Sequence, residues 1–485
     1  MSLISLVITF AICFSMVFVD RSRRMLILIM TILLLDCFRI GGFSFSAVRD
    51  LAIITFAIME IRRGSTCWRQ LRQTVIPWLL LIVATGDMIL IFHSPHLRQT
   101  VPIVGFILSD LAIKTGALAY GFLGIADRRQ IASYWKPIFC ALLFLTFMGL
   151  VEVMFGSSPL HNLLGIDASW RNEERNRATS IFISPFDYGY INILLLIYFL
   201  YLNRHYRLEK WVFWTAVGCC LIGVIICGCR TVLATFLISI VTYSIFAYNI
   251  FRNAGVGLTV VILTIFAYSY IPAVQEKADF LLSAVGTDTN IGGSSAEMRM
   301  RQYTATLYYV RNDMWFGRGY NFFNIDMGWD EGGFSTLRDD DLMGLEGILM
   351  SYMLERGIVG CAFYLLFYGT FIIYIFIRRP RFKQEAACII TLLIACVSFG
   401  NMTGELGSVL PTLLFCGMYY KIGLIRYRLT ERERRYKEAV LHEQALREHL
   451  IPSSSSLLPQ SSQSSQSSQS SISLPSARSS SVCKP

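Results

Sequence analysis

Two glutamates stand directly ahead of a long apolar run and have the chemistry of proton acceptors. Glu346 and Glu355 precede residues 357–377, a stretch of 21 residues without a charged side chain. A run of that length crosses a bilayer as a helix, so Glu355 and Arg356 are expected at the outer membrane interface and Glu346 above it. In a straight helix, nine residues advance about 13 Å and turn about 900°, which predicts opposite faces for the two glutamates. A carboxylate in this position can accept a proton from a hydroxyl group.

Arginines make up the second set of candidate residues. Three of them, Arg177, Arg299 and Arg301, lie in the two longest connectors of the chain, and Arg230 opens a later span at or just below the same outer surface. The planar guanidinium grips phosphate or pyrophosphate oxygens, so these arginines indicate an anion site. The alternative is that they form ordinary loop ion pairs with Glu173, Glu174 and the aspartate run at 339–341. The residues alone leave both interpretations open.

The composition predicts an all-α, polytopic membrane protein that positions these residues. Of 485 residues, 54% are hydrophobic and 16% charged, and the mean hydropathy is +0.52, which excludes a soluble globular protein. Alternating ten-residue segments, as in a β-barrel, do not appear. The net charge of +10 lies mainly in short connectors, which is a topology signal and argues against nucleic-acid binding. We interpret the first apolar stretch as a retained span, because it lacks the basic start and cleavage site of a signal peptide.

The apolar runs predict twelve or thirteen transmembrane helices. They lie near residues 3–19, 25–38, 45–60, 74–92, 100–125, 137–155, 179–202, 211–228, 231–251, 254–271, 354–377, 386–402 and 406–422. Basic connectors such as "DRSRR" and "RRPRFK" fall on alternate sides of the span count. The positive-inside rule assigns them, with the C-terminus, to the cytoplasm. The connectors 156–178 and 272–345 then face outward, and the second is a large periplasmic loop.

We expect four regions along the chain. Residues 1–155 hold N-terminal transmembrane helices, and residues 156–425 hold the core with both outer loops. Residues 426–451 read as a charged cytoplasmic helix, and residues 452–485 as a Ser/Gln-rich tail too polar to bury a core.

Other residues with metal-binding or acid–base chemistry have a simpler explanation. Cysteines 219, 220, 227 and 229 share one span without a histidine or carboxylate, as small packing residues would. The aspartates 339–341 read as a solvated acidic loop, and His161 as a loop histidine. We therefore expect no metal and no cofactor. Asp87, Asp110 and Lys114 lie inside apolar runs. An ionisable side chain inside the membrane is energetically costly and usually has a function.

Two stretches resemble the entry points of spans in the O-antigen ligase/polymerase family, bacterial membrane proteins that act on polyprenyl-linked glycans. "RATSIFISPFDYGY" is similar to the family's Arg, short hydrophobic stretch, Pro-Asn and Gly, with Phe186 where Asn is usual. "CGCRTVLATFL" is similar to its Ser-Arg-Thr opening of a span, with Cys229 in place of Ser.

Two further stretches resemble the family's large outer loop and the helix that follows it. "RMRQYTATLYYVRNDMWFGRGYNFF" is similar to an Arg, aromatic, Pro-x-x-Gly-x-Gly run, with Met314 or Trp315 replacing Pro. "EGILMSYMLERGIVG" is similar to a His-Asn-x-Tyr-Leu, Glu-x-Gly-hydrophobic-Gly signature with its spacing kept. Glu346 occupies the place of the His and Gly347 that of the Asn. The resemblance covers roughly residues 170–380.

The resemblance implies a glycosyltransferase of the bacterial inner membrane with its site on the periplasmic side. The donor is a glycan on undecaprenyl pyrophosphate, and the acceptor is a glycan or lipid-linked glycan. Arg177, Arg230, Arg299 and Arg301 would hold the pyrophosphate, and Glu346 would orient or deprotonate the acceptor hydroxyl. Glu355 and Gly357 would support the site. Membrane lipids are expected partners, a chain-length regulator is a candidate partner, and nucleic acid is not.

Several functions remain in competition at this point. The glutamate in place of histidine favours a polysaccharide polymerase over a ligase to lipid A–core. A polysaccharide or lipid transporter would show charged or Gly-broken helices near mid-membrane in two matching halves, and no such halving of the sequence is visible. An envelope scaffold that uses the charged helix and the Ser/Gln tail is the third class.

Overall fold

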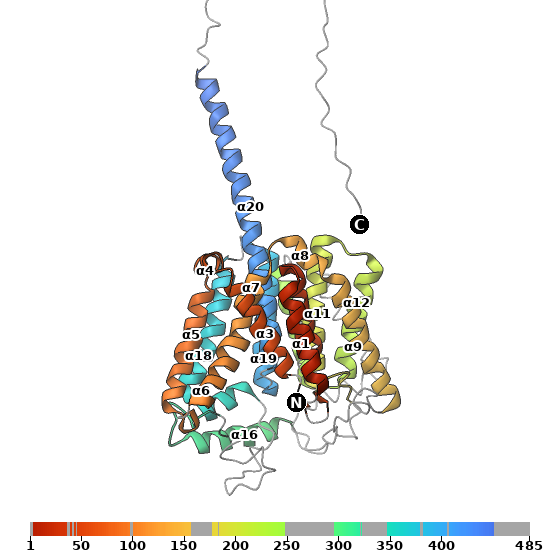
Figure 1. Ribbon diagram of the computed structural model, residues 1–485, viewed down its shortest axis with the longest axis vertical. Helices are drawn as coiled ribbons and strands as arrows, with labels where there is room; N and C mark the ends of the chain where they lie inside the picture. The colour runs from red at the N-terminus through yellow and green to blue at the C-terminus, as the bar shows by residue number, and fades with distance from the viewer. Residues whose placement is uncertain are drawn as a thin grey trace, which may run out of the picture. The chain divides into compact units, whose positions relative to one another are not determined.

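The described part of the chain is almost entirely helical (Figure 1). The computed structural model describes residues 3–35, 39–40, 43–44, 46–97, 100–156, 177–182, 184–247, 295–320, 322, 347–378, 382–404 and 407–450. Within these ranges, the only strands are β1 (Arg39–Ile40) and β2 (Phe43–Ser44), an antiparallel pair with Arg39 opposite Ser44.

The helices of the N-terminal third follow one another through short connections. They are α1 (Leu3–Phe18), α2 (Arg21–Leu35), α3 (Ser46–Ile61), α4 (Ser65–Arg72), α5 (Ile76–His93), η1 (Pro95–Leu97), α6 (Thr100–Ile107), η2 (Leu108–Thr115), α7 (Gly116–Gly124), α8 (Arg128–Ser133) and α9 (Trp135–Phe155).

The remaining described helices include the two longest. They are α11 (Pro185–Tyr206), α12 (Lys210–Ile226), α13 (Arg230–Ala247), α16 (Ser295–Val310), α18 (Ile348–Arg378), α19 (Lys383–Thr403) and α20 (Val409–Leu450). The chain divides into two compact units, Met1–Arg428 and Leu429–Pro485. The described part of the second unit is the charged end of α20, where Arg435 lies 3.1 Å from Glu431 one helical turn earlier. All further description concerns the first unit.

In the described part of the chain, seven helical stretches are long and apolar enough to cross a membrane. They are Ile76–His93, Pro102–Gly124, Arg128–Phe155, Pro185–Tyr206, Arg230–Ala247, Ile348–Arg378 and Lys383–Thr403, and Val7–Phe18 and Lys210–Ile226 are shorter apolar helices. The predicted all-α polytopic architecture is thereby confirmed. The predicted total of twelve or thirteen spans includes residues 254–271, which lie outside the described residues, so the count stays a prediction.

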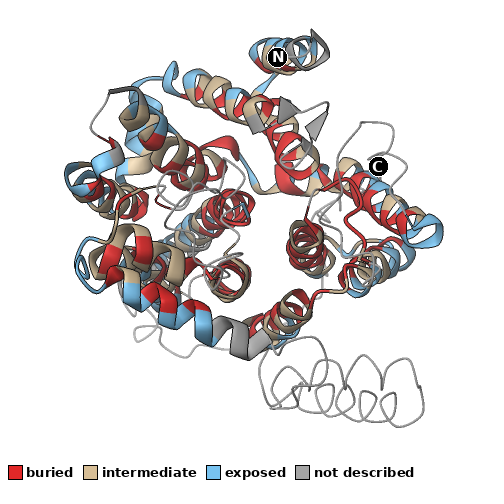
Figure 2. Ribbon diagram, turned by 90° about the horizontal axis from the view of Figure 1, so that it is seen from below, coloured by how far each residue is buried: buried red, intermediate tan, exposed pale blue. Residues whose placement is uncertain are grey.

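The outside of the bundle is apolar, as a lipid-facing surface requires. Large hydrophobic side chains are exposed on many helices, among them Trp78, Phe92, Phe147, Trp214 and Phe376. Figure 2 shows the buried faces of the helices turned toward their neighbours, with the exposed faces at the rim. Soluble monomers rarely expose apolar surface on this scale, and a helix satisfies its own backbone hydrogen bonds in lipid. The surface therefore fits insertion in a bilayer.

The interior is built on α7, α11, α19 and the start of α20, which are largely enclosed. Close approach between α7 and α20 depends on glycine. A Cβ on Gly121 would overlap the backbone of Leu414, and a Cβ on Gly417 would overlap the backbone of Leu118. Small residues at such crossings let helix backbones touch, which is a common device in membrane bundles.

Two predicted spans differ from the observed helices in ways that matter for the site. The span predicted at 100–125 contains the π-helical segment η2, in which Thr115 Oγ1 donates to the Asp110 carbonyl at 3.0 Å. Segments of this kind are rare and often mark functional sites. The span predicted at 179–202 begins only at Pro185, because Ser180 has a left-handed φ of 56° and the preceding residues are not helical.

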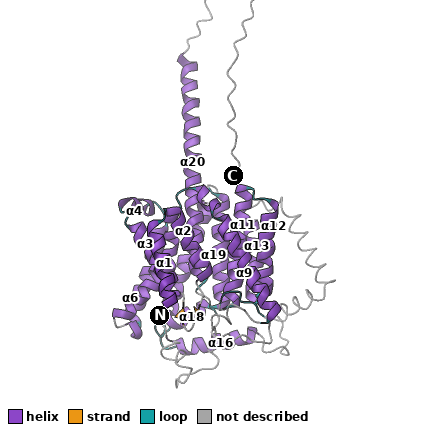
Figure 3. Cartoon of the chain, turned by 45° about the vertical axis from the view of Figure 1, so that its right-hand side comes forward, coloured by secondary structure: helices purple, strands orange, loops and turns teal. Residues whose placement is uncertain are grey.

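The connectors occupy the two ends of the bundle as the charge pattern predicted. The basic helices α4 and α8 lie at one end, and α16 lies across the opposite end (Figures 1 and 3). Helix α16 packs against α18. Residues of the long connector are therefore separated from the basic connectors by the full length of the bundle.

Candidate functional site

Helix α18 is interrupted at Gly357, where the backbone adopts φ 63° and ψ −163°. In an unbroken helix, the amides of Ile358 and Val359 would donate to the carbonyls of Leu354 and Glu355. They donate instead to Met314 O at 3.0 Å and Trp315 O at 3.1 Å. The span predicted at 354–377 lies within a helix long and apolar enough to cross a membrane, but this helix is not straight, because the Gly357 backbone breaks its hydrogen-bond ladder.

The segment 314–319 fills this break from the other side. The carbonyls of Leu354 and Glu355 accept from the amides of Arg318 at 2.8 Å and Gly319 at 3.0 Å. The four backbone groups freed by the break are thus all satisfied by one turn of the outer connector. Non-helical backbone at membrane depth is tolerated only where protein covers it in this way.

Glycine makes this contact possible on both sides. A Cβ on Gly357 would lie 2.5 Å from the Trp315 carbonyl oxygen, and a Cβ on Gly317 would lie 2.6 Å from the Gly357 nitrogen. Both residues have positive φ, 63° and 70°. The sequence stretches "GRGYNFF" and "ERGIVG" are therefore two halves of one structural feature, which we call the α18 break (residues 314–319 and 354–359).

The segment after the turn is anchored on the end of α5. The Tyr320 amide donates to Ser94 Oγ at 3.0 Å, and the Tyr320 ring packs edge-on against Phe106 at 4.7 Å between centroids. Burial, with the neighbouring Glu355 carboxylate, raises the pKa of the Tyr320 phenol. Phe316 stacks on His93 at 3.7 Å. These contacts fix the position of the α18 break relative to α5 and α6.

Arg356 turns into the protein and has partners there. Its side chain is 12% exposed and forms ion pairs with Asp110 (Nη2–Oδ2, 3.2 Å) and Asp87 (Nη1–Oδ1, 3.5 Å). The guanidinium also lies over the Tyr352 ring, 4.4 Å from its centroid. The sequence supplied no partner for this arginine, and its predicted position at the membrane interface stays a prediction.

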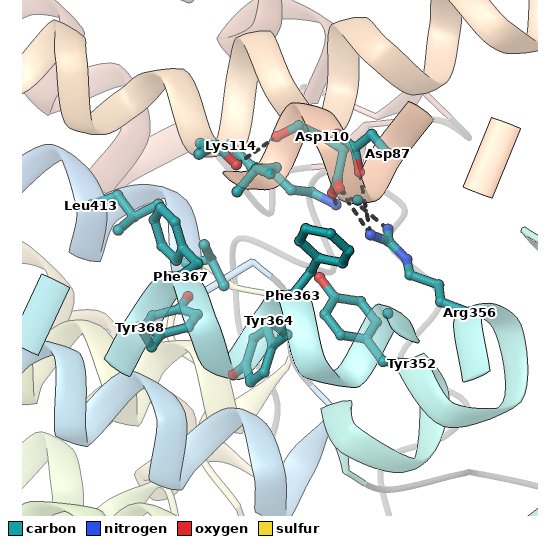
Figure 4. A pocket seen from close by; sticks show the side chains of 15 residues that line it. Asp87, Asp110, Lys114, Tyr352, Arg356, Phe363, Tyr364, Phe367, Tyr368 and Leu413 are labelled. Carbon is teal, nitrogen blue, oxygen red and sulfur yellow. Dashed lines mark hydrogen bonds and ion pairs between the residues drawn. The ribbon is translucent and has the colours of Figure 1, made fainter. Parts of the chain in front are cut away.

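Four ionisable side chains meet beside the break. Figure 4 shows Asp87, Asp110 and Lys114 on one side of a pocket, with Arg356 reaching toward the aspartates from α18 on the other. We call Asp87, Asp110, Lys114 and Arg356 the buried charge cluster. Lys114 Nζ lies 3.6 Å from Asp110 Oδ1. The sequence singled out the first three because charge in an apolar run is costly. It missed their arginine partner, 246 and 269 positions along the chain from the two aspartates.

The other predicted members of this region have different outcomes. Glu355 is half-buried next to Arg356. Glu346 lies outside the described residues. Its neighbour Gly347 has a φ of 111° and comes before the first residue of α18. The predicted opposite faces for the two glutamates stay a prediction.

Arg177 and Arg230 belong to two segments that the structure brings together. The Ala178 amide donates to the Ile226 carbonyl at 3.0 Å. A Cβ on Gly228 would lie 3.1 Å from Arg177 Cγ, and Arg230 is the first residue of α13, two positions later. The predicted proximity of the two arginine segments follows from this pairing.

Glu152 holds this region in place and was not singled out from the sequence. It is 3% exposed and accepts hydrogen bonds from the amides of Thr179 at 2.8 Å and Ser180 at 2.7 Å. Helix α9 starts next to α8, so Glu152 near its other end lies at the end of the bundle away from α8. Segment 177–182 is therefore at that end as well. A single carboxylate within "GLVEVMF" was the available signal.

Arg299 and Arg301 lie on α16, which crosses the same end of the bundle (Figure 1). The Arg301 side chain is exposed, and the Arg299 side chain lies outside the described residues. Gln302 and Thr306 form the buried face of the helix. The structure thus joins α16 to α18, and Arg177 to the α12–α13 turn, at one end of the molecule.

Metal binding finds no support in the described part of the chain. No group of three or more His, Cys, Asp or Glu side chains there has the arrangement of a metal site. Asp339–Asp341 and His161 lie outside the described residues. Cys227 Sγ donates to the Val224 carbonyl at 3.0 Å, and Cys229 Sγ to the Cys227 carbonyl at 3.3 Å. Both are buried, as predicted for packing residues.

The chain was compared with protein families and with curated proteins. No protein-family model matches it, and no curated protein matches it. The case for a function therefore depends on the motifs and on the geometry of the site.

Proposed function

We propose that the protein is a membrane glycosyltransferase that uses undecaprenyl-pyrophosphate-linked glycan repeat units at the extracytoplasmic face of a bacterial inner membrane. We favour a polysaccharide polymerase, with ligation to lipid A–core as the alternative acceptor reaction. The orientation follows from the basic connectors, which mark the cytoplasmic end. The C-terminus is then cytoplasmic.

One observation carries this proposal. Two stretches resemble the transferase family, one in the long connector and one in α18, and their residues Arg311 and Arg356 are 45 positions apart. The two stretches meet in the α18 break through four backbone hydrogen bonds. The two arginine stretches likewise meet at the α12–α13 turn. Stretches with no shared role would have no reason to pair in this way at the end opposite the basic connectors.

In the proposed reaction, the acceptor hydroxyl attacks the anomeric carbon of the donor sugar. The bond from that carbon to the pyrophosphate oxygen breaks, and a new glycosidic bond forms with inversion. Glu346 takes the hydroxyl proton. Arg177, Arg230, Arg299 and Arg301 hold the pyrophosphate and stabilise the negative charge that it gains as it leaves. The guanidinium groups supply the electrostatic stabilisation, so the scheme requires no metal. Glu355 and Gly357 shape the backbone behind Glu346.

The test is transfer by the purified protein from a defined lipid-linked donor. We expect Glu346→Gln and Arg299→Ala to abolish long-chain glycan while membrane insertion is retained. Arg311→Ala is the matched control, because Arg311 is an exposed arginine just past the end of α16. Unchanged product length in the first two variants would remove both residues from the site. Lipid A–core as acceptor in the same assay separates a ligase from a polymerase.

A transporter is the second candidate, and the buried charge cluster favours it. A broken helix beside intramembrane charges is the arrangement found at substrate sites of many transporters. Flux across the membrane of sealed vesicles, with no new glycosidic bond, would favour this function. Polymer formation in detergent solution, where no compartments exist, would favour the transferase.

A further inference from the structure

The pocket beside the α18 break has two chemically different walls (Figure 4). Helix α5 and segment η2 supply the carboxylates and the lysine, and α18 supplies the arginine and several aromatic rings. The cavity measures about 60 Å³. Since one water needs on the order of 10–15 Å³ by this measure, it has room for a few waters and not for a sugar.

The two aspartates of the buried charge cluster have unequal partners. Asp110 accepts from both terminal nitrogens of Arg356, at 3.2 and 3.3 Å, and lies near Lys114. Asp87 has one long contact with Arg356, 3.5 Å from Oδ1. Among the described residues, Asp87 Oδ2 has no hydrogen-bond partner, although Asp87 is only 3% exposed.

An ionised carboxylate in that position is expensive. A buried carboxylate needs hydrogen bonds or a close opposite charge to offset the loss of water. Arg356 and Lys114 already neutralise Asp110, and the negative charge of Asp110 opposes a second one beside it. Protonation of Oδ2 removes the charge of Asp87 and creates an O–H donor toward the cavity.

We propose that Asp87 binds a proton in this cavity and exchanges it with solvent through cavity water. In the step, the carboxylate Oδ2 takes one proton from a hydronium ion in the cavity water, which becomes a neutral water molecule, and the carboxylate becomes a neutral carboxylic acid. Arg356 then keeps both of its contacts to Asp110 and is released from Asp87. Arg356 directly precedes Gly357, so its ion pairs hold the α18 break in place. Binding of the proton to Asp87 therefore changes the side-chain contacts of the break.

Among the described residues, the ionisable groups that line the pocket with Asp87 belong to η2 and α18. Segment η2 contributes Asp110 and Lys114, and α20 contributes only the apolar Val409 and Leu413. Helix α18 contributes the guanidinium of Arg356 and the phenols of Tyr352, Tyr364 and Tyr368. Two cationic side chains, Arg356 and Lys114, lie next to one anionic side chain, Asp110. Their positive charge disfavours a metal cation in the cavity, whereas a proton bound to Asp87 fits.

The experiment is infrared difference spectroscopy of the full-length purified protein in lipid nanodiscs. We expect the carbonyl band of one protonated carboxylic acid, which grows as the pH falls and shifts in heavy water. The band is lost in Asp87→Asn and kept in Asp20→Asn, because Asp20 is a largely exposed aspartate paired with Arg23. The measurement requires no glycan substrate, so its outcome is independent of the proposed transferase reaction.

Three results would overturn the proposal. They are a wild-type protein without the band, a band that persists in Asp87→Asn, and a band removed by sodium at constant pH. If Asp87→Asn does not insert, Asp87→Glu replaces it. That variant keeps a carboxyl group and is expected to move the band, and an unmoved band would assign the proton to another residue.

Discussion

Substitution of Gly357 tests whether the docked turn holds the α18 break. An alanine there must adopt φ 63° and ψ −163°, a region of backbone space that is essentially restricted to glycine and costs about 1–3 kcal/mol. Its Cβ would also lie 2.5 Å from the Trp315 carbonyl oxygen. That atom is backbone and cannot rotate away, so the turn must move.

The size of the effect follows from the hydrogen bonds that the turn would lose. Four backbone hydrogen bonds join residues 314–319 to residues 354–359. At a net value of about 0.5–1.5 kcal/mol each, their loss lowers the free energy of local opening by about 2–6 kcal/mol. Even the lower limit corresponds to about 30-fold faster amide exchange.

Hydrogen exchange read by mass spectrometry measures this directly. In Gly357→Ala, the amides of Arg318, Gly319, Ile358 and Val359 are expected to exchange at least about 30-fold faster than in the wild type. Gly369→Ala is the matched control in the same helix, because a Cβ on Gly369 meets nothing within 4 Å. It is expected to be neutral or to stabilise by up to about 1 kcal/mol. Equal exchange of the four amides in both variants would refute the docked arrangement.

Three further outcomes are expected. Arg356→Leu leaves two buried carboxylates without their cation and is expected to lower the free energy of unfolding by about 3–5 kcal/mol, whereas a drop below about 1 kcal/mol in chemical denaturation would show that the pairs are weak. Glu152→Ala removes the acceptor of two buried amides and is expected to cost about 2–6 kcal/mol at segment 177–182; proteolysis of that segment no faster than in the wild type would contradict the role. Arg301→Ala is expected to raise the KM for the lipid-linked donor at unchanged folding, with Arg311→Ala as the neutral reference, and equal KM values would separate Arg301 from the donor.

The helical architecture could be predicted because hydropathy is a local property. An apolar run long enough to span the hydrocarbon is recognised from its own residues, and α12 and α19 appear close to their predicted positions. The ends of the bundle were also predictable, since positive charge marks one side. Neither prediction needs a contact between distant parts of the chain.

The α18 break could not be predicted in the same way. "ERGIVG" has no proline, and a single glycine is tolerated within a helix, so nothing local announces the break at Gly357. The break is stable only because the amides of Arg318 and Gly319 satisfy the freed carbonyls. These amides lie in a connector some forty residues earlier, and a hydropathy profile does not show which distant segments come into contact.

The buried charge cluster was predicted in part for a related reason. Asp87 and Asp110 stand out because ionised groups are costly inside an apolar run. Arg356 did not stand out, because a charge at the end of a run reads as an interfacial residue. The ion pairs of 3.2 and 3.5 Å show that the arginine turns inward, and only the position of α5 and η2 decides that.

The α18 break and the buried charge cluster involve adjacent residues, Gly357 and Arg356. Together, their contacts hold the first half of α18 in place. Residues 348–356 are held by the docked turn at one end and by Arg356 on the aspartates. At their start, a Cβ on Gly347 would lie 2.9 Å from the Asn401 carbonyl oxygen, so this residue is pressed against the end of α19. All three contacts are to protein and none depends on lipid. The backbone of residues 347–356 is therefore positioned by contacts within the protein. The second half of α18 is packed as well, since Tyr364, Phe367 and Phe371 are buried in the core.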